Sequence, residues 1–328
     1  MVEGKKSINF LKGMLCLLPA IVLLGIFTFY PIVNTFLMSF KEGYNYLITN
    51  EKNFESWGFG NYVKLFSEGN NFPKYLINTM VIVFVSVPVS ITLSLLIAVA
   101  LNSIKPLQRF LQTIFFLPYV TNTIAIGMVF SVMFESHQGL MNTLITSLGG
   151  SSINWLGGNT QAALIGEGIF THSFFNAQWF TSMIVLLAYI VWNSLPFKVL
   201  ILLSSLQSID KQYYQAAQID GTTKARTFMR ITVPLLSPQI FYLLITSFIG
   251  AFKEYTSVVA IFGDNAQSVG QKNNMATVVW YIYQKTKEQS LSGYPQTSLA
   301  AAGAVILFII IMIFTAINSY VSKKKVHY

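Results

Sequence analysis

Residues 215–221 read Gln-Ala-Ala-Gln-Ile-Asp-Gly, a polar run that lies between two long apolar stretches of the chain. Asp210 or Ser208 can cap a helix that starts at Lys211. That helix is expected to end at Gly221, because glycine readily takes the left-handed conformation that follows many helices. The run therefore predicts a short helix outside the apolar stretches, where a soluble partner can reach it.

The next segment, residues 222–232, predicts a second short helix that ends before Pro234, since proline cannot donate the hydrogen bond of a continuing helix. The two helices would form a helix-turn-helix elbow. Ala216 and Ala217 leave one face of the first helix with little side-chain bulk, so another surface can approach its backbone. The spacing is equally compatible with a plain amphipathic connector packed against the rest of the chain.

The composition of the chain is that of a membrane protein. Of its 328 residues, 53% are hydrophobic and 10% are charged, and the mean hydropathy is +0.56. Soluble domains carry about 25% charged residues, so this chain has too little charge to cover a globular surface. We therefore expect an all-α polytopic membrane protein.

Six apolar stretches are long enough to cross a bilayer, which needs about 20 residues per helix. They are residues 11–38, 77–101, 109–134, 180–206, 236–262 and 298–321. The first is too long for the apolar part of a signal peptide, so it is expected to be a retained helix. The prediction is a transmembrane domain over 11–321 with a polar loop over 207–235 and short tails at 1–10 and 322–328. The remaining connections, 39–76, 135–179 and 263–297, are predicted loops, with short interfacial helices such as one around 162–170.

The positive charges gather on one side of the predicted membrane. The two tails, the connection near residue 105, the 207–235 loop and the span ends at Lys12 and Arg109 together hold twelve Lys or Arg against three acids, whereas the opposite side holds seven lysines against eight acids. The positive-inside rule makes the basic side cytoplasmic, with both termini on it. Topology thus accounts for the net charge of +9. Nucleic-acid binding is not expected, because no basic-aromatic stripe or zinc-type spacing accompanies the charge.

The elbow resembles the EAA loop of binding-protein-dependent ABC transporter permeases, since Gln215-Ala-Ala-x-x-Asp220-Gly221 is followed by Phe228, Ile231 and Val233-Pro234. Other motifs resemble the F-type permease of the carbohydrate-uptake subfamily. They are Phe116-Leu-Pro118-Tyr119, Gly139-Leu-Met-Asn142, Trp192-Asn-Ser-Leu-Pro196-Phe197, Leu206-Gln-Ser208-Ile209 and Met275-Ala-Thr-x-x-x-Tyr-Ile282-Tyr283. The resemblance covers residues 10–321 and implies six transmembrane helices with the ABC importer permease (MetI-like) core.

The resemblance implies that the helix at 211–221 is a coupling helix, which docks in a groove of an ATPase subunit. The residues expected to make this contact are Gln215, Ala216, Ala217, Asp220 and Gly221. Gln215 stands where the family usually has Glu, and Thr222 replaces the usual Ala. An amide forms only neutral hydrogen bonds, so docking should be weaker by about 1 kcal/mol. Shape is then expected to govern the contact more than charge.

The resemblance also implies a sugar pathway lined by residues of three spans. These are Tyr119, Thr123, Asn193, Ser194, Phe197, Ser247 and Glu254. Sugars are recognised by aromatic faces and by hydroxyl, amide or carboxylate partners, all of which this set contains. Each residue is also compatible with ordinary packing between helices, where small polar groups act as glue.

Three ionisable residues lie at membrane depth, where such groups are costly. Lys253 and Glu254 point about 100° apart on a helix. Glu254 is therefore expected to line the pathway while Lys253 reaches outward. Lys198 is expected to reach the cytoplasmic boundary or a neighbouring subunit.

The chain lacks a phosphate-binding loop, a catalytic constellation and metal-type spacing, so it is not expected to be an enzyme or to hold a metal. ATP and Mg²⁺ are expected on a separate ATPase. The expected partners are a second, unlike permease, two ABC ATPase subunits, an extracellular solute-binding protein and a sugar substrate. The expected location is the cytoplasmic membrane of a bacterium.

Three alternatives to a sugar importer remain open. An importer of the same architecture for an anionic solute, such as a polyol phosphate, would favour Arg or Lys in the pathway, whose matched positions contain an acid and no cation. A self-sufficient secondary transporter predicts inverted repeats and broken helices, and no internal repeat is visible. A membrane enzyme is disfavoured by the missing catalytic groups.

Overall fold

The computed structural model describes residues 2–44, 53–67, 70–104, 108–136, 138–156, 177–264, 275–287 and 296–325. The chain divides into two units. Unit 1 contains Met1–Asn70 and Ile282–Ile306, and unit 2 contains Asn71–Tyr281 and Leu307–Tyr328. The helix predicted around 162–170 lies outside the described residues.

Unit 1 begins with one long apolar helical run. It consists of α1 (Val2–Leu24), the π-helical turn η1 (Gly25–Phe29) and α2 (Tyr30–Ser39). The following connection, predicted as a loop, contains the antiparallel pair β1 (Lys41–Glu42) and β2 (Ser56–Trp57) and then α3 (Gly60–Phe66). Asn61 holds this region together, because its buried amide donates to the carbonyls of Ser39 at 2.9 Å and Lys41 at 3.0 Å.

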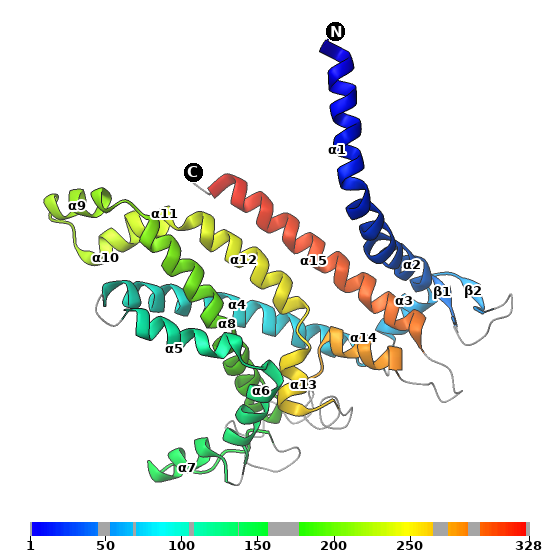
Figure 1. Ribbon diagram of the computed structural model, residues 1–328. Helices are drawn as coiled ribbons and strands as arrows, with labels where there is room; N and C mark the ends of the chain where they lie inside the picture. The colour runs from blue at the N-terminus through cyan, green and yellow to red at the C-terminus, as the bar shows by residue number, and fades with distance from the viewer. Residues whose placement is uncertain are drawn as a thin grey trace. The chain divides into compact units, whose positions relative to one another are not determined.

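Two long helices form the centre of unit 2. They are α4 (Phe72–Ser103) and α8 (Ala177–Ser208), which cross each other (Figure 1). Their buried apolar side chains include Ile82, Val83, Leu186 and Leu202. Small buried residues also recur every four positions along α4, at Ser86, Ser90, Ser94 and Ala98, and such rows let apolar helices approach closely. The last helix, α15 (Thr297–Lys325), runs from unit 1 into unit 2.

The predicted span at 109–134 is two helices with a sharp bend between them. These are α5 (Gln108–Val120) and α6 (Thr123–Met133), and their axes differ by 97°. Asn122 makes the bend because its backbone is extended and its Oδ1 accepts from the backbone N–H groups of Ile124 at 2.9 Å and Ala125 at 3.3 Å. An asparagine that caps a new helix starts it in a new direction.

The predicted span at 236–262 is also broken. Its parts are α12 (Ser237–Phe252) and α13 (Thr256–Phe262). Glu254 lies in the break, where its Oε1 accepts from the backbone N–H of Ser257 at 2.9 Å and its carbonyl accepts from the Thr277 hydroxyl at 2.8 Å. The side chain of Glu254 therefore satisfies a free N–H group at the start of α13.

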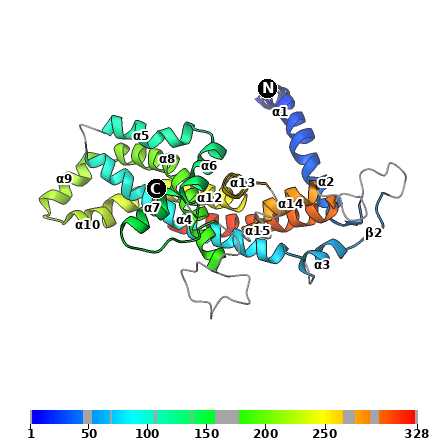
Figure 2. The ribbon, with the colours of Figure 1, turned by 90° about the horizontal axis from the view of Figure 1, so that it is seen from below.

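The elbow has more elements than predicted. It contains α9 (Lys211–Ile219), α10 (Lys224–Thr227), the π-helical turn η2 (Phe228–Thr232) and α11 (Val233–Leu235). The expected stop before Pro234 is wrong, because Pro234 lies in the first turn of α11, where its missing N–H is not needed. The chain then turns by 66° into α12. In both views α9 and α10 lie at the end of unit 2 away from α13 (Figures 1 and 2).

Two further helices, α7 (Leu140–Ser147) and α14 (Val278–Lys287), lie in connections predicted as loops. Asn142 organises the connection that contains α7. Its Nδ2 donates to the carbonyls of Ser136 and Ile153, both at 2.8 Å, and its Oδ1 accepts from Trp155 Nε1 at 3.0 Å. At the start of α14, the backbone N–H of Val278 donates to Thr79 Oγ1 at 3.1 Å and so ties the beginning of this helix to α4.

Within the described residues, four helical stretches are long and apolar enough to cross a membrane. Two bent pairs raise this number to six if each counts as one span: one joins α5 and α6, and the other joins Lys224–Leu235 and Ser237–Phe252. If the second pair counts as one span, that span includes residues 224–235, which the sequence analysis assigned to the polar loop.

Candidate functional site

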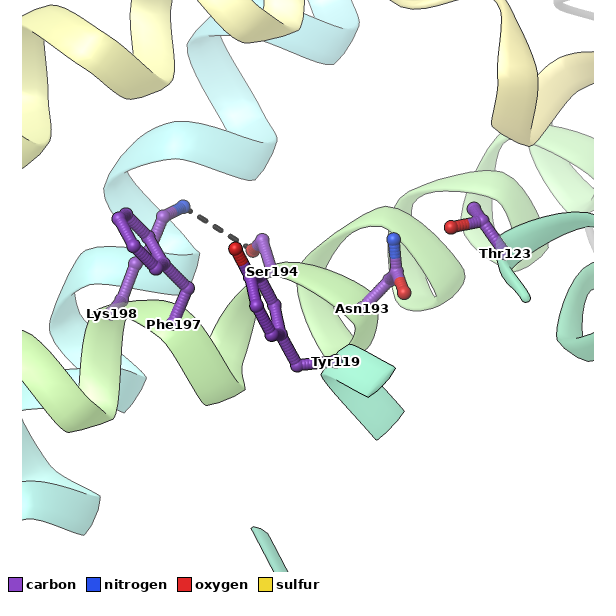
Figure 3. A pocket seen from close by; sticks show the side chains of 6 residues that line it. All are labelled: Tyr119, Thr123, Asn193, Ser194, Phe197 and Lys198. Atoms are coloured by element: carbon purple, nitrogen blue, oxygen red, sulfur yellow. Dashed lines mark hydrogen bonds between the residues drawn. The ribbon is translucent and has the colours of Figure 1, made fainter. Parts of the chain in front are cut away.

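Five of the seven predicted pathway residues line one cavity of about 280 Å³ in unit 2 (Figure 3). The lining residues are Tyr119, Thr123, Asn193, Ser194, Phe197 and Lys198. Three elements supply them, namely the end of α5, the start of α6 and the middle of α8. The cavity therefore lies at the 97° bend, which turns Tyr119 and Thr123 toward the same stretch of α8.

Two aromatic rings form one wall of the cavity. Tyr119 and Phe197 are stacked with their centroids 5.8 Å apart and their planes 16° from parallel. Tyr119 is 53% exposed and Phe197 is 36% exposed in this chain, so both retain free ring surface. The hydroxyl of Tyr189, on α8, donates to the carbonyl of Thr123 at 2.6 Å and thereby fixes the start of α6 on α8.

The polar part of the lining lies along one face of α8. Ser194 and Lys198 are four residues apart, so they lie on the same face of the helix. The Nζ of Lys198 donates to Ser194 Oγ at 3.2 Å and to Ser90 Oγ of α4 at 2.5 Å. Asn193 and Thr123 add an amide and a hydroxyl to the lining (Figure 3).

Lys198 was expected to reach the cytoplasmic boundary or a neighbouring subunit. Within this chain it is only 6% exposed and lines the cavity. The bend of α5 against α6 and the packing of α4 on α8 enclose it. Its spacing from Ser194 was the signal in the sequence that could have placed it with the other pathway residues.

Ser247 and Glu254 are not among the residues that line this cavity. Ser247 lies on α12, and the carboxylate of Glu254 accepts the N–H of Ser257 at the start of α13. The expected separation of Glu254 from its neighbour does occur, since Lys253 is exposed and Glu254 is half-buried. The cavity contains a lysine that was not among the matched positions, and it lacks this acid. The assignment of Ser247 and Glu254 to the sugar pathway stays a prediction.

The elbow presents the second candidate surface. Asp210 caps α9 by accepting the N–H of Gln212 at 3.0 Å, and Gly221 follows the helix with φ +66°, as the sequence predicts. The N–H groups of Gly221 and Thr222 donate to the carbonyls of Gln218 at 3.1 Å and Ala217 at 3.0 Å. This is a Schellman ending, which fixes the direction in which the chain leaves α9.

The predicted contact residues divide between two faces of α9. Gln215, Ala216, Asp220 and Gly221 are exposed. Ala217 is 5% exposed and faces the chain itself, so its small size serves internal packing and does not open the outer face. Tyr214 helps to hold this inner face, because its hydroxyl lies 3.2 Å from the hydroxyl of Thr232.

Comparison with known proteins identifies the class of the chain. Residues 68–327 match the family model described as the binding-protein-dependent transport system inner membrane component. This match covers most of the chain. The chain belongs to this family. It is a multi-pass inner-membrane permease of the ABC transporter class and not an enzyme.

The permease is similar along its length to curated permeases with known names. It is 30% identical to the arabinooligosaccharides transport system permease protein AraP of Bacillus subtilis, over 90% of this chain and 83% of the relative. It is 27% identical to the lactose transport system permease protein LacF of Rhizobium radiobacter, over 96% of this chain and 95% of the relative.

A solved structure has the same fold. One chain of a bacterial alginate ABC transporter, in complex with an alginate pentasaccharide-bound periplasmic protein, matches with a TM-score of 0.74. The match covers 99% of the permease and 97% of that chain at 21% identity. The likeness therefore extends over both units of the permease.

One exposed residue of the permease was not predicted from the sequence. Ile219, in the last turn of α9, is 87% exposed although it is apolar. It is separated by three positions from Ala216, so both lie near one face of α9. The signal in the sequence was an apolar residue three positions after Ala216, in a loop outside the predicted spans.

Proposed function

We propose that this permease is the membrane subunit of an ATP-driven importer for a sugar or oligosaccharide delivered by an extracellular solute-binding protein. The observation that carries the proposal is the cavity at the joint of α5, α6 and α8. It combines a stacked aromatic pair with hydroxyl and amide groups, which are the groups that recognise a sugar ring and its OH groups. The names of the two curated relatives, which transport lactose and arabinooligosaccharides, support the same substrate class.

In this proposal the permease forms half of the translocation pathway. A second, unlike permease forms the other half, and two ATPase subunits bind ATP and Mg²⁺ in the cytoplasm. The basic side chains of Lys211, Lys224, Arg226 and Arg230 are all exposed on the elbow, which supports a cytoplasmic position for α9 and for both termini.

The exposed face of α9 is the proposed contact with the ATPase. Ala216 gives close access to the helix backbone, while Ile219 gives an apolar side chain that a groove can bury. Closure of the ATPase pair would then move α9 and favour one of two conformations of the pathway. This is alternating access by differential stabilisation of two states.

Reconstitution tests the proposal. The permease, its partner permease and its ATPase are placed in proteoliposomes, and uptake of labelled oligosaccharides is measured with and without ATP and the binding protein. We expect uptake that requires both. Uptake that continues without the ATPase subunit would instead favour a secondary transporter and overturn the proposal.

A further inference from the structure

The cavity contains a cation whose contacts within the chain leave its charge unmatched. The Nζ of Lys198 donates to the hydroxyls of Ser90 and Ser194 at 2.5 Å and 3.2 Å. An ammonium group has three donors, so one remains. Both partners are neutral hydroxyls. Among the described residues that line the cavity, Lys198 is the charged one and none is an acid.

The burial of this cation is unfavourable in free energy unless an opposite charge compensates it. Lys198 is 6% exposed and lies in the middle of α8, one of the candidate spans. A charge at membrane depth that lacks an opposite charge is unfavourable by several kcal/mol in general, and such residues typically mark substrate pathways. Glu254, which the sequence suggested as the acid of the pathway, uses its carboxylate to cap α13.

We infer that the cavity takes a sugar unit that bears one negative charge, such as a uronate, and that the ammonium group of Lys198 pairs with that charge. The inference rests on the proposed function and narrows its substrate class. The stacked rings of Tyr119 and Phe197 lie beside Lys198 (Figure 3), so a ring held against the aromatic wall brings a substituent to the ammonium group. The remaining hydroxyls of such a ring can meet Asn193 and Thr123.

The number of charges favours a monoanion. The lining has one cation, which balances one carboxylate, whereas a phosphate monoester carries about −1.5 to −2 charges at neutral pH and would leave a surplus. The volume of about 280 Å³ is at the small end for ligand cavities. It suits one ring of a longer chain. The alternative explanation for the buried ammonium group of Lys198 is an ion pair with a carboxylate of the second permease.

The test is transport by the complete importer with its own binding protein. Labelled disaccharides of galacturonate, glucuronate and mannuronate are each compared with the carboxyl-reduced disaccharide, which has the same ring and no charge. We expect the wild-type importer to prefer one of the acids over its neutral counterpart. We expect Lys198→Gln, which removes the charge and keeps an amide with two donors, to lower kcat/KM for that acid by about tenfold to a hundredfold. Uptake of neutral sugars should fall by a clearly smaller factor than uptake of the acid, because a neutral ring loses no charge pairing.

Lys253→Gln is the matched control, because it removes the same charge from an exposed position on the next broken span. It should leave the preference for the acid unchanged. Transport of neutral sugars alone by the wild type would overturn the inference while leaving the proposed function in place. Equal losses for acid and neutral sugars in Lys198→Gln, or loss of the second permease from the complex, would also overturn it and assign the charge to assembly. If neither class of sugar is transported, the proposed function fails, and this inference fails with it.

Discussion

At the scale of single residues, Gly127 decides how closely α6 approaches α13. A Cβ atom added at this glycine would overlap the Cβ of Ala260, and the backbone of Ala260 is also within contact distance. Gly127 is buried, so the added atom has no space to avoid the clash. The packing at the outer wall of the bend thus depends on the absence of one side chain.

We therefore predict that Gly127→Ala lowers the stability of the permease by about 1–3 kcal/mol, the usual cost of overpacking a core. Gly250→Ala in α12 is the matched control, because a Cβ there meets no atom within 4 Å. It should be neutral or stabilising by up to about 1 kcal/mol, since alanine favours a helix. Thermal unfolding of the purified protein measures both. Equal effects in the two variants would contradict the close-packing argument.

The residues of the cavity show what the sequence could predict and what it could not. Asn193, Ser194, Phe197, Tyr119 and Thr123 were all assigned to the pathway by resemblance to a family. Helical spacing places Asn193 and Phe197, four residues apart, on one side of α8, but it does not bring Tyr119 or Thr123 to that helix. The cavity position of Lys198 was not predicted, because it depends on Ser90 of α4, a helix that lies far earlier in the chain.

At the scale of elements, the break between α12 and α13 depends on a side-chain cap. Glu254 accepts the N–H of Ser257 and lies beside Thr277, which donates to its carbonyl. These contacts give Glu254 a structural role that does not need its charge. A glutamine retains an oxygen that can accept the same N–H, whereas an alanine does not.

We predict that Glu254→Ala destabilises the permease by about 1 kcal/mol through loss of the cap, and that Glu254→Gln retains most of the stability. Thermal unfolding and sugar uptake are measured for both variants. Uptake should follow stability. If Glu254→Gln is fully stable and yet loses uptake as strongly as Glu254→Ala, the carboxylate has a direct role with the substrate.

The two breaks also explain where the predicted spans were inaccurate. Hydropathy indicates how long an apolar stretch is, and the stretches 109–134 and 236–262 are long enough to cross a membrane. It does not indicate the direction of a helix axis. One helix ends and another begins at Asn122 and at Glu254, where a polar side chain accepts free N–H groups at the start of the next helix. Polar capping residues inside an apolar stretch were the signal of a break.

At the scale of the whole molecule, the elbow and the cavity are joined by α8, which begins at Ala177 and ends three residues before α9. The same helix supplies Ser194, Phe197 and Lys198 to the cavity. In the proposed importer, a displacement of α9 is therefore transmitted by a continuous helix to one wall of the cavity.

We predict that Ala216→Trp abolishes uptake, because the exposed face of α9 would no longer approach the ATPase groove. Ala216→Ser is the small matched control and should transport within about twofold of the wild type, since exposed substitutions of similar size have little effect. Gln215→Glu should leave coupling intact or strengthen it, because it supplies a charge-assisted contact. Uptake and sugar-stimulated ATP hydrolysis are compared in the assembled complex. Normal transport by Ala216→Trp would show that this face does not couple.

The bend at Asn122 places one end of α6 at the cavity and the other end, at Met133, far from it. A helix of 11 residues is about 16 Å long, so a rotation of about 10° around the bend moves its far end, at Met133, by about 3 Å. The same rotation would move Thr123, which lies next to the bend, by only a small fraction of that distance. Asn142 donates to the carbonyls of Ser136 and Ile153 in the connection after Met133, at the distant end of α6. A rotation of α6 about the bend would therefore displace this end far more than the cavity wall.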